Sequence, residues 1–171
     1  ADGIAVKKPG ELTFELCSKY VDEIVTVDDD EIAQAILFLM ERGKMVAEGA
    51  GAAPVAAIMN HKFDVSGKVA AVISGGNIDV TMISRIIEKG LLRAGRMTKL
   101  RILMQDRPGQ LEMASRVIAA EGANVMVVHH DRTDVDLDIR DAILEITMET
   151  QDRDHAQRVI NALREAGFKV S

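Results

Sequence analysis

Aromatic residues, cysteine and proline are all scarce in this chain of 171 residues, and each shortage limits what the protein can be. Aromatic residues make up 3% of the chain and tryptophan is absent, whereas hydrophobic residues make up 47%. A core is possible, but it must consist mainly of aliphatic side chains and methionine. The single cysteine, Cys17, excludes an internal disulfide, which fits a reducing cytoplasm. Because it lies in a predicted helix, we expect a buried structural thiol, with a reactive thiol as the alternative.

The chain also lacks a basic surplus and long apolar runs. Its 21 Lys and Arg residues stand against 27 Asp and Glu, a formal net charge of −6. This balance argues against binding to nucleic acid or to an anionic membrane surface. No apolar run approaches the ~20 residues that span a membrane, and no basic leader followed by an apolar stretch opens the chain. We therefore expect a cytoplasmic protein without a signal peptide.

The first half of the chain alternates predicted helices with short apolar segments. Helical spacing of apolar residues predicts helices over 12–20, 31–42, 48–60 and 80–89. Strands are predicted over 23–27 and 68–73, and a brief extended piece over 45–47. This order, with strands that are not alternating in polarity, is typical of a parallel sheet covered on both faces. Pro54 fits a first helical turn, so the third helix is expected to start near Ala53, and Gly90 is expected to end the fourth.

The second half has a different periodicity. Strands are predicted over 100–104, 124–132, 142–149 and 168–170, and helices over 110–121 and 152–166. The order β-α-β-β-α-β is typical of a ferredoxin-like antiparallel sheet with both helices on one face. The open face is expected to carry Leu103, Met126 and Val128, and such a face favours pairing with another copy. We therefore expect an α/β protein with domains over 1–92 and 98–171 and a linker over 93–97.

Several clusters of possible metal ligands have simpler explanations. Asp28, Asp29 and Asp30 precede a predicted helix and suit its N-terminus, with a metal cluster as the sharper alternative. His129 and His130 are adjacent on a predicted strand, so they point to opposite faces and are expected to be strand or interface residues. A solvated hairpin loop is expected to hold Asp131, Asp134, Asp136 and Asp138. We therefore expect no metal site.

The stretch 103–111, Leu-Met-Gln-Asp-Arg-Pro-Gly-Gln-Leu, places a D-x-P-G-x-L turn between the first strand and first helix of the second half. Pro108 fixes φ, Gly109 lets the backbone approach a ligand, and the unpaired N–H groups that open the helix suit a carboxylate. Together with Gly-Ala-Asn-Val at 122–125 and the β-α-β-β-α-β order, this turn resembles the ACT domain family over about 99–171.

The ACT resemblance implies a regulatory role. Domains of this family pair through their sheets and bind small effectors at the shared interface. The resemblance implies an amino-acid effector near Asp106, Gly109, Gln110, Leu111 and Asn124. Isoleucine or valine is the expected effector, with threonine and serine as further candidates, and ACT–ACT pairing is expected to give a homodimer or tetramer. The alternative is a plain strand-to-helix turn with no ligand, because some ACT domains are purely structural.

The stretch 71–79, Ala-Val-Ile-Ser-Gly-Gly-Asn-Ile-Asp, puts a hydroxyl and two glycines at the carboxyl end of a predicted buried strand. In open α/β sheets, ligands bind at such strand ends. This stretch follows Ala-Asp-Gly-Ile-Ala-Val at 1–6, Tyr-Val-Asp-Glu-Ile-Val-Thr-Val at 20–27 and Val-Ala-Glu-Gly-Ala-Gly-Ala at 46–52. In this order, the stretches resemble the C-terminal part of the threonine ammonia-lyase (threonine dehydratase) family, fold type II pyridoxal-phosphate enzymes, over about 1–92.

This second resemblance implies a wall of the pyridoxal 5'-phosphate site formed by Gly3, Glu48, Ser74, Gly75, Gly76 and Asn77. Ser74 would hydrogen-bond the pyridine nitrogen, and Glu48 would lie near the ring. A neutral hydroxyl makes the ring a weaker electron sink than a carboxylate would, which suits β-elimination. The implied reaction converts threonine to 2-oxobutanoate and ammonia, with serine as a slower substrate.

The family's Schiff-base lysine and tetraglycine phosphate loop have no counterpart in this chain. The chain is therefore expected to be a C-terminal fragment of the enzyme that binds the cofactor poorly and is inactive by itself. One alternative is a stand-alone amino-acid-binding regulatory module, and another is a serine racemase-like or other fold type II enzyme. The single ACT domain favours the lyase over the racemase. For residues 74–77, the alternative is a turn with no ligand.

Overall fold

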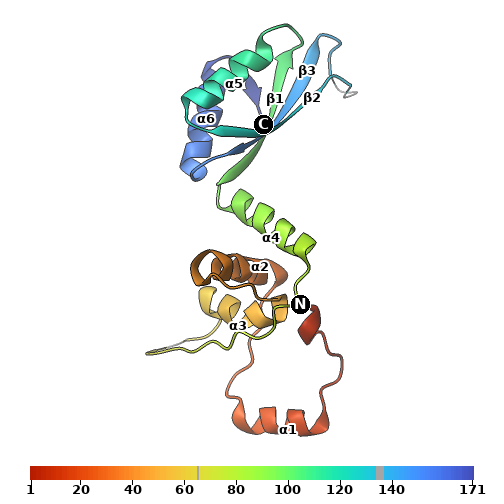
Figure 1. Cartoon of the computed structure of the whole chain (residues 1–171), viewed down its shortest axis with the longest axis vertical. Coiled ribbons are helices and arrows are strands. Elements are labelled where there is room, and N and C mark those ends of the chain that lie inside the picture. Colours follow the sequence, from red (N-terminus) through yellow and green to blue (C-terminus); the bar gives the residue numbers. More distant parts are fainter. Residues whose placement is uncertain (65, 134–136) are drawn as a thin grey trace. The chain divides into compact units, whose positions relative to one another are not determined.

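The computed structural model describes residues 1–64, 66–133 and 137–171, which fall into two compact units, Ala1–Gly90 and Leu91–Ser171. Each unit has its own hydrophobic cluster. Figure 1 shows the helices and strands of both units along the chain. The domain limits expected from the sequence, with 93–97 as a linker, stay a prediction.

The second unit is a four-stranded antiparallel sheet with two helices packed on it (Figure 1). Its elements are β1 (Met97–Gln105), α5 (Gln110–Ala120), β2 (Asn124–Asp131), β3 (Asp141–Glu149), α6 (Arg153–Glu165) and β4 (Lys169–Val170). The strands lie in the order β2-β3-β1-β4, and each neighbouring pair is antiparallel. The predicted β-α-β-β-α-β fold is confirmed.

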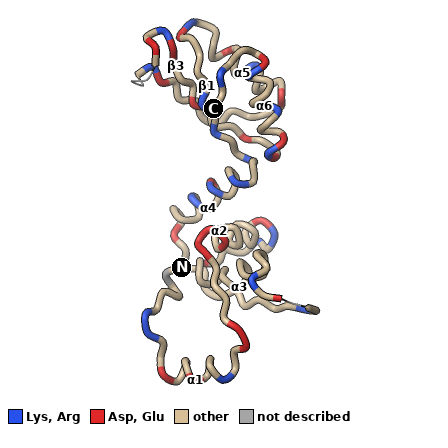
Figure 2. The backbone as a smooth tube through the Cα atoms, turned by 180° about the vertical axis from the view of Figure 1, so that it is seen from behind, with Lys and Arg blue, Asp and Glu red and all other residues tan. Residues whose placement is uncertain are grey.

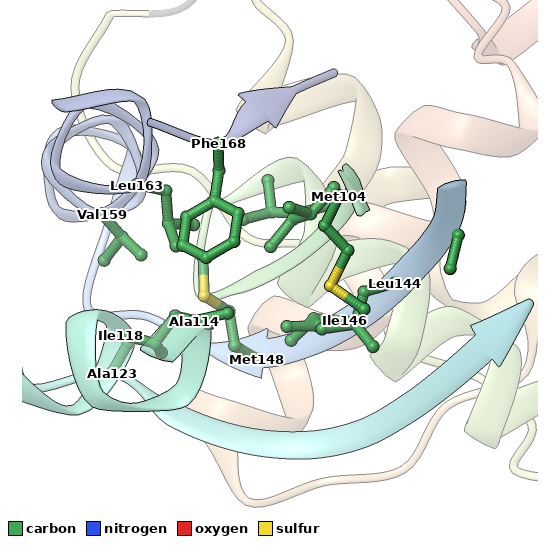
Figure 3. Packing of buried hydrophobic residues seen from close by; sticks show 13 residues of the cluster. Met104, Ala114, Ile118, Ala123, Leu144, Ile146, Met148, Val159, Leu163 and Phe168 are labelled. Carbon is green, nitrogen blue, oxygen red and sulfur yellow. The ribbon is translucent and has the colours of Figure 1, made fainter. Parts of the chain in front are cut away.

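An aliphatic core joins this sheet to both helices, as the shortage of aromatic residues requires. Alternate residues of β1 and β3 are buried, and side chains of α5 and α6 meet them from one face (Figure 3). The largest fully buried side chains of this core are Ile102, Ile118, Leu144, Ile146, Met148, Val159 and Leu163. Both helices therefore lie on one face, as predicted.

His155 joins the two helices at one end of the layer. Its side chain is almost wholly buried, and its Nε2 lies 2.9 Å from the backbone oxygen of Glu121, just after α5. Its Nδ1 accepts a hydrogen bond from the backbone N–H of Gln151 at 3.1 Å. Because Nδ1 accepts, a neutral ring carries its proton on Nε2 and donates it to Glu121. Both ring nitrogens of this buried side chain are thus satisfied.

A β-bulge in β2 shifts the side-chain alternation of that strand. The register of β2 against β3 slips at Met126, which is the extra residue. Beyond the bulge, Val128 lies opposite Ile146 and so shares the face that the helices cover. The prediction that Val128 lies on the open face is therefore wrong, whereas Leu103 does lie on that face, opposite Ile143.

The first unit is helical, and its described residues contain no sheet. Its elements are η1 (Asp2–Ile4), α1 (Glu11–Tyr20), α2 (Asp29–Phe38), η2 (Leu39–Gly43), α3 (Gly49–Met59) and α4 (Val80–Arg93), which continues past Gly90. The turn η2 is π-helical and closes α2. Helix α2 packs against α3, and the cluster between them includes Ile32, Ile36, Leu39, Ala52 and Ala56.

Asp28 begins α2 as predicted. Its carboxylate accepts a hydrogen bond from the Glu31 N–H at 2.8 Å, and the Glu31 carboxylate accepts one from the Asp28 N–H at 2.9 Å. This reciprocal arrangement is a capping box. Asp30 pairs with Lys89 of α4 at 2.7 Å, and Asp29 lies in the first turn of α2. The aspartates therefore serve the start of the helix.

The segments 23–27 and 68–73, predicted as strands, form no strand in this structure, and neither does 45–47. A strand exists only where a neighbouring backbone supplies a ladder of hydrogen bonds. One such bond is present, from the Glu48 N–H to the Gly75 oxygen at 3.2 Å, but a single bond makes no ladder. The composition of these segments predicted strands, and the pairing that a strand requires is missing here.

Helix α3 and helix α4 both differ from the predicted limits. Helix α3 begins at Gly49 rather than near Ala53, so Pro54 lies inside it and removes one backbone hydrogen bond. Helix α4 runs through Gly90, where an added Cβ would lie 2.3 Å from a Leu37 methyl carbon. Gly90 is thus explained by close packing rather than by the end of a helix.

The prediction of a buried Cys17 is wrong. The thiol is exposed, because α1 buries none of its residues against the unit. The apolar spacing that predicts the helix is present, but no other element of the described chain covers it.

Candidate cofactor and effector sites

The six residues predicted to line the cofactor converge at the N-terminus of α3. Glu48 is the N-cap of that helix, and its side chain makes no capping bond. Instead, its Oε2 accepts a hydrogen bond from the backbone N–H of Asn77 at 3.3 Å, while its own N–H donates to Gly75. The segment 74–77 is thereby held against the start of α3. Gly3 reaches the same place, since a Cβ there would lie 3.2 Å from Glu48 Oε1.

Glycine is required where the backbones meet. A Cβ on Gly51 would lie 1.6 Å from the Ser74 carbonyl oxygen, so this carbonyl packs directly on the helix. Gly75 has a φ of +73°, and a Cβ there would lie 2.5 Å from the Glu48 carboxyl carbon. The many Gly and Ala residues of α3 allow a neighbouring element to approach closely. The neighbouring element is the 74–77 segment.

This arrangement fits the edge of a planar heteroaromatic cofactor. Ser74 offers a neutral hydroxyl on an exposed segment, and the two residues that follow it, Gly75 and Gly76, carry no side chains. A hydroxyl can donate to a ring nitrogen without fixing a proton on that nitrogen. The Glu48 carboxylate lies against Gly75 and accepts a hydrogen bond from the Asn77 N–H, so it serves the backbone.

A separate apolar cavity of about 490 Å³ lies elsewhere in the first unit. It is lined by residues of η1, 25–27, α2 and α3, including Ile4, Val25, Ile32, Ala53 and Pro54. None of the six predicted cofactor residues lines it. The cavity borders the segment 23–27, which the sequence predicts as a strand, so it lies where a further layer of a sheet would be expected.

In the second unit, the predicted effector turn lies at the N-terminus of α5. Gly109 has a φ of +89° and precedes the first helical residue, Gln110, without any side-chain capping bond. The Gln110 N–H donates to the Arg107 oxygen at 3.4 Å, so the N–H groups of the next residues in the first turn are the ones that no side chain caps. Next to the turn is a cavity of about 340 Å³ lined by Gln105, Arg107, Gln110, Met113 and Lys169 among others.

Charged residues that the sequence did not indicate surround Asp106. Arg132 Nε lies 3.0 Å from Asp106 Oδ2, and His130 Nε2 lies 3.8 Å from its Oδ1. Among the described residues, that buried His130 nitrogen has no hydrogen-bond partner. The register places His129 opposite Glu145 and His130 opposite Leu144, so the two rings do point to opposite faces. The proximity of residues 106, 130 and 132 depends on how the strands pair, so the sequence alone did not indicate it.

Asn124 does not join the other predicted effector residues within one copy. It begins β2, opposite Glu149, and its amide donates to the Glu149 carboxylate at 2.9 Å. Asp106 follows β1 at the other end of the sheet, beyond the pair of Gln105 with Asp141. A ligand at the turn therefore cannot touch Asn124 of the same chain.

The aspartates after β2 are only partly described. Asp134 and Asp136 lie outside the described residues. Asp131 accepts hydrogen bonds from the backbone N–H and the hydroxyl of Thr133, at 2.8 and 2.9 Å, and these bonds hold the pKa of Asp131 below its ordinary value. Over residues 1–64, 66–133 and 137–171, no three His, Cys, Asp or Glu side chains are grouped as metal ligands would be.

Comparison with known families agrees with this division. Residues 1–75 match the family of pyridoxal-phosphate dependent enzymes, and residues 94–166 match the ACT domain family. The chain joins a segment of the pyridoxal-phosphate family to an ACT domain. In the described part of this chain, no helix has the length and apolar character to cross a membrane.

Two curated relatives match nearly the whole chain. The L-threonine ammonia-lyase of Thermotoga maritima is 54% identical over 171 residues, which are 99% of this chain and 42% of that protein. The L-threonine ammonia-lyase of Geobacter sulfurreducens is 47% identical over the same shares. The chain thus spans less than half the length of these curated relatives. A solved ACT domain, from the GTP pyrophosphokinase of Chlorobium tepidum, is 17% identical with a TM-score of 0.36, covering 44% of this chain and 94% of that one.

Proposed function

We propose that this chain is the C-terminal part of an allosteric, cytoplasmic threonine ammonia-lyase, which converts threonine to 2-oxobutanoate and ammonia. The observation that carries the proposal is the 54% identity, along nearly the whole chain, to a relative of that name. The convergence of Gly3, Glu48 and residues 74–77 supports it, because the sequence resemblance assigns these residues to one site.

In this proposal, Ser74 binds and orients pyridoxal 5'-phosphate. When bound, the cofactor supplies a ring that withdraws electrons from the substrate bond being broken. The Ser74 hydroxyl donates a hydrogen bond to the ring nitrogen and holds the proton on its own oxygen. The Glu48 carboxylate accepts a hydrogen bond from the Asn77 N–H and so holds the 74–77 segment in position. Gly75 and Gly76 keep side chains away from the ring.

The test is a threonine assay on the full-length protein that carries this sequence. Ser74→Ala is expected to lower kcat about tenfold to a hundredfold, because a hydrogen bond to the reacting system is lost. Ser74→Thr, which keeps the hydroxyl, is expected to retain most of the activity. Equal loss in both variants would give Ser74 a packing role. The 171-residue chain alone is expected to show no turnover, and turnover by it would overturn the assignment of the lysine to another part of the protein.

We further propose that the ACT domain binds an amino-acid effector at the turn after β1. The N–H groups that open α5 suit the effector's carboxylate, and the Asp106 carboxylate suits its ammonium group. Asn124 lies at the other end of the sheet, so any part that it has in binding requires a second copy of the domain. Pairing through the open face, where Leu103 and Ile143 lie, would form such a dimer or, with further contacts, a tetramer.

Calorimetry tests the effector. Isoleucine or valine is expected to bind with a Kd between roughly 1 μM and 1 mM, with threonine and serine as comparison ligands. Asp106→Asn is expected to weaken binding at least about tenfold. The matched control is Asp154→Asn, which removes the same charge at the opposite end of the helix layer and is expected to bind as the parent does. No heat with any of the four amino acids would make the ACT domain purely structural.

The identity to threonine ammonia-lyases along nearly the whole chain disfavours the alternative of a stand-alone regulatory module. It would leave the 74–77 segment and Glu48 without a ligand. Activity of the full-length protein on threonine separates the two proposals, because a module would show effector binding without turnover. A serine racemase activity would appear as D-serine when L-serine is supplied as the substrate.

A further inference from the structure

His130 holds a buried ring nitrogen without a partner, beside the proposed effector turn. Its Nε2 is hidden from solvent, yet among the described residues it forms no hydrogen bond. Buried polar atoms in folded proteins nearly always have a partner, because an unsatisfied one has lost its hydration without compensation. Oδ1 of Asp106 lies 3.8 Å away, which is too far for a hydrogen bond. A small movement would therefore give this nitrogen a partner.

The two carboxylate oxygens of Asp106 have different surroundings. Oδ2 lies 3.0 Å from Nε of Arg132, whereas Oδ1 faces the His130 ring and accepts no hydrogen bond from the described residues. The Asp106 N–H donates to the backbone oxygen of Arg140 at 2.8 Å, which fixes the residue beside the β2–β3 connection. Figure 2 shows both acidic and basic residues in this part of the second unit. One oxygen thus has a cation as its partner, and the other remains available for one.

The other described groups around the ring are apolar, turned away or already paired. Across β3 on the covered face lie the buried side chains of Ala142, Leu144 and Ile146. Along β2, the neighbours His129 and Asp131 alternate to the opposite face. Helix α5 carries Glu112 in its first turn, and an arginine one turn later donates to that carboxylate at 3.0 Å. A charge on the ring is therefore balanced by Asp106 and opposed by Arg132.

Protonation of the ring changes what Oδ1 of Asp106 can bind. A neutral ring leaves Oδ1 to an incoming cation, such as the ammonium group of an amino acid. A protonated ring presents an N–H and a positive charge, and a shift of about 1 Å brings Nε2 to the length of a charge-assisted hydrogen bond. The ring then takes the place of the ammonium group and repels it, because three cations would surround one carboxylate. Imidazoles commonly change charge between about pH 5 and pH 8.

We propose that His130 is a further residue of the effector site, and that its protonated ring competes with the effector's ammonium group for Asp106. This inference rests on the proposed binding of an amino-acid effector at the turn after β1. The coupling is reciprocal, so binding of the effector releases the proton from the ring. The domain therefore binds its effector more tightly in neutral than in mildly acidic solution.

Calorimetric titration of this chain with isoleucine and with valine tests the coupling. The Kd is expected to be about fivefold or more higher at about pH 5.5 than at about pH 7.5. The carboxylate and ammonium groups of a free amino acid keep their charges over this interval, so the change reports on the protein. At about pH 6.5, titrations in two buffers of different ionisation enthalpy are expected to show that a fraction of one proton leaves on binding.

Two neighbouring substitutions assign the effect to one ring. His130→Gln removes the titrating group but keeps an N–H donor, and it is expected to bind with the same Kd at both pH values and to release no proton. His129→Gln is the matched control, because this exposed histidine lies opposite Glu145 on the other face. It is expected to keep the pH dependence and the proton release of the parent chain.

The outcomes separate this inference from the effector function on which it rests. If neither amino acid binds at either pH value, the effector function fails and the role of His130 fails with it. Binding of equal strength at both pH values, or tighter binding in acid, overturns the role of His130 and leaves the effector function standing. A pH dependence that survives in His130→Gln, or that disappears in His129→Gln, also contradicts the assignment to His130.

Discussion

The two units differ in whether their predicted strands pair. In the second unit, four such segments pair with one another within about eighty residues, and helices α5 and α6 cover the resulting face. In the first unit, the segments 23–27 and 68–73 are similar in composition but have no ladder partner among the described residues. Antiparallel neighbours can be supplied by short turns, whereas parallel neighbours need long crossovers. Membership of a sheet is therefore a property of the available neighbours more than of the segment.

The largest expected effect contrasts one residue from each kind of segment. Leu144→Ala, in the buried centre of β3, is expected to lower the free energy of unfolding of the second unit by about 2–5 kcal/mol, because it leaves a cavity. Val72→Ala, in the segment 68–73, is expected to change the free energy of unfolding of the first unit by less than about 0.5 kcal/mol, because Val72 is 76% exposed. Denaturant unfolding measures both. A large effect of Val72→Ala would mean that this segment has a partner after all.

A second prediction concerns the close contact in the first unit. Gly51→Ala is expected to lower the free energy of unfolding of the first unit by about 1–3 kcal/mol. It is also expected to displace the 74–77 segment, because the new methyl group would overlap the Ser74 carbonyl. Gly49→Ala is the matched control two residues earlier, where the nearest atom would lie at an ordinary 3.5 Å. That change is expected to be neutral or stabilising by up to about 1 kcal/mol, through helix propensity. Thermal unfolding together with the Asn77 amide chemical shift follows both, and equal effects would contradict the close approach.

A third prediction compares the helix caps of the two units. Asp28→Ala removes the capping box of α2, and Asp152→Ala removes the acceptor of the His155 N–H at the start of α6. Each substitution is expected to lower the free energy of unfolding by about 1 kcal/mol. In the first unit, the cost is expected to appear as local fraying of α2 in hydrogen exchange. In the second, it is expected to lower the stability of the whole unit, because α6 carries part of the core.

The smallest expected effect is a pH dependence at Asp131. Its pKa in the folded state is lowered from the ordinary 3.8 by the hydrogen bonds from Thr133. A lowered folded-state pKa stabilises the folded form above pH 3.8, and this contribution is lost as the pH falls through the folded value. The Thr133 amide resonance is expected to move with the same midpoint. In Asp131→Asn, that midpoint is expected to disappear, and a midpoint at or above 3.8 in the parent would contradict the assignment.

The sequence was sufficient for the second unit because its information is local. Alternation of apolar and polar residues predicted β1 and β3, and helical spacing of apolar residues predicted α5 and α6. The Pro108-Gly109 turn marked the start of α5. The bulge at Met126 was not visible, because an extra residue leaves no mark in composition. It moved Val128 to the covered face. The cluster of Asp106 with His130 and Arg132 was equally hidden, since it depends on how the strands pair.

In the first unit, the sequence indicated which residues meet but not how. Glu48 and residues 74–77 were assigned to one site by resemblance, and the structure brings them together. The reason they meet, the missing Cβ at Gly51, could be suspected only from the number of small residues in α3. Cys17 and Gly90 were misjudged because helical spacing and a glycine each have two explanations, and the deciding fact is the distance to a neighbour.

His155 of α6, which hydrogen-bonds to the end of α5, affects how the second unit opens locally. His155 connects positions that are 34 residues apart, and its ring accepts from one backbone group and donates to another. Opening either end of this connection leaves a polar group of the ring without a partner inside an apolar layer. The amides around Gln151 and the end of α5 are therefore expected to exchange with deuterium in one shared event, at a free energy close to that of global unfolding.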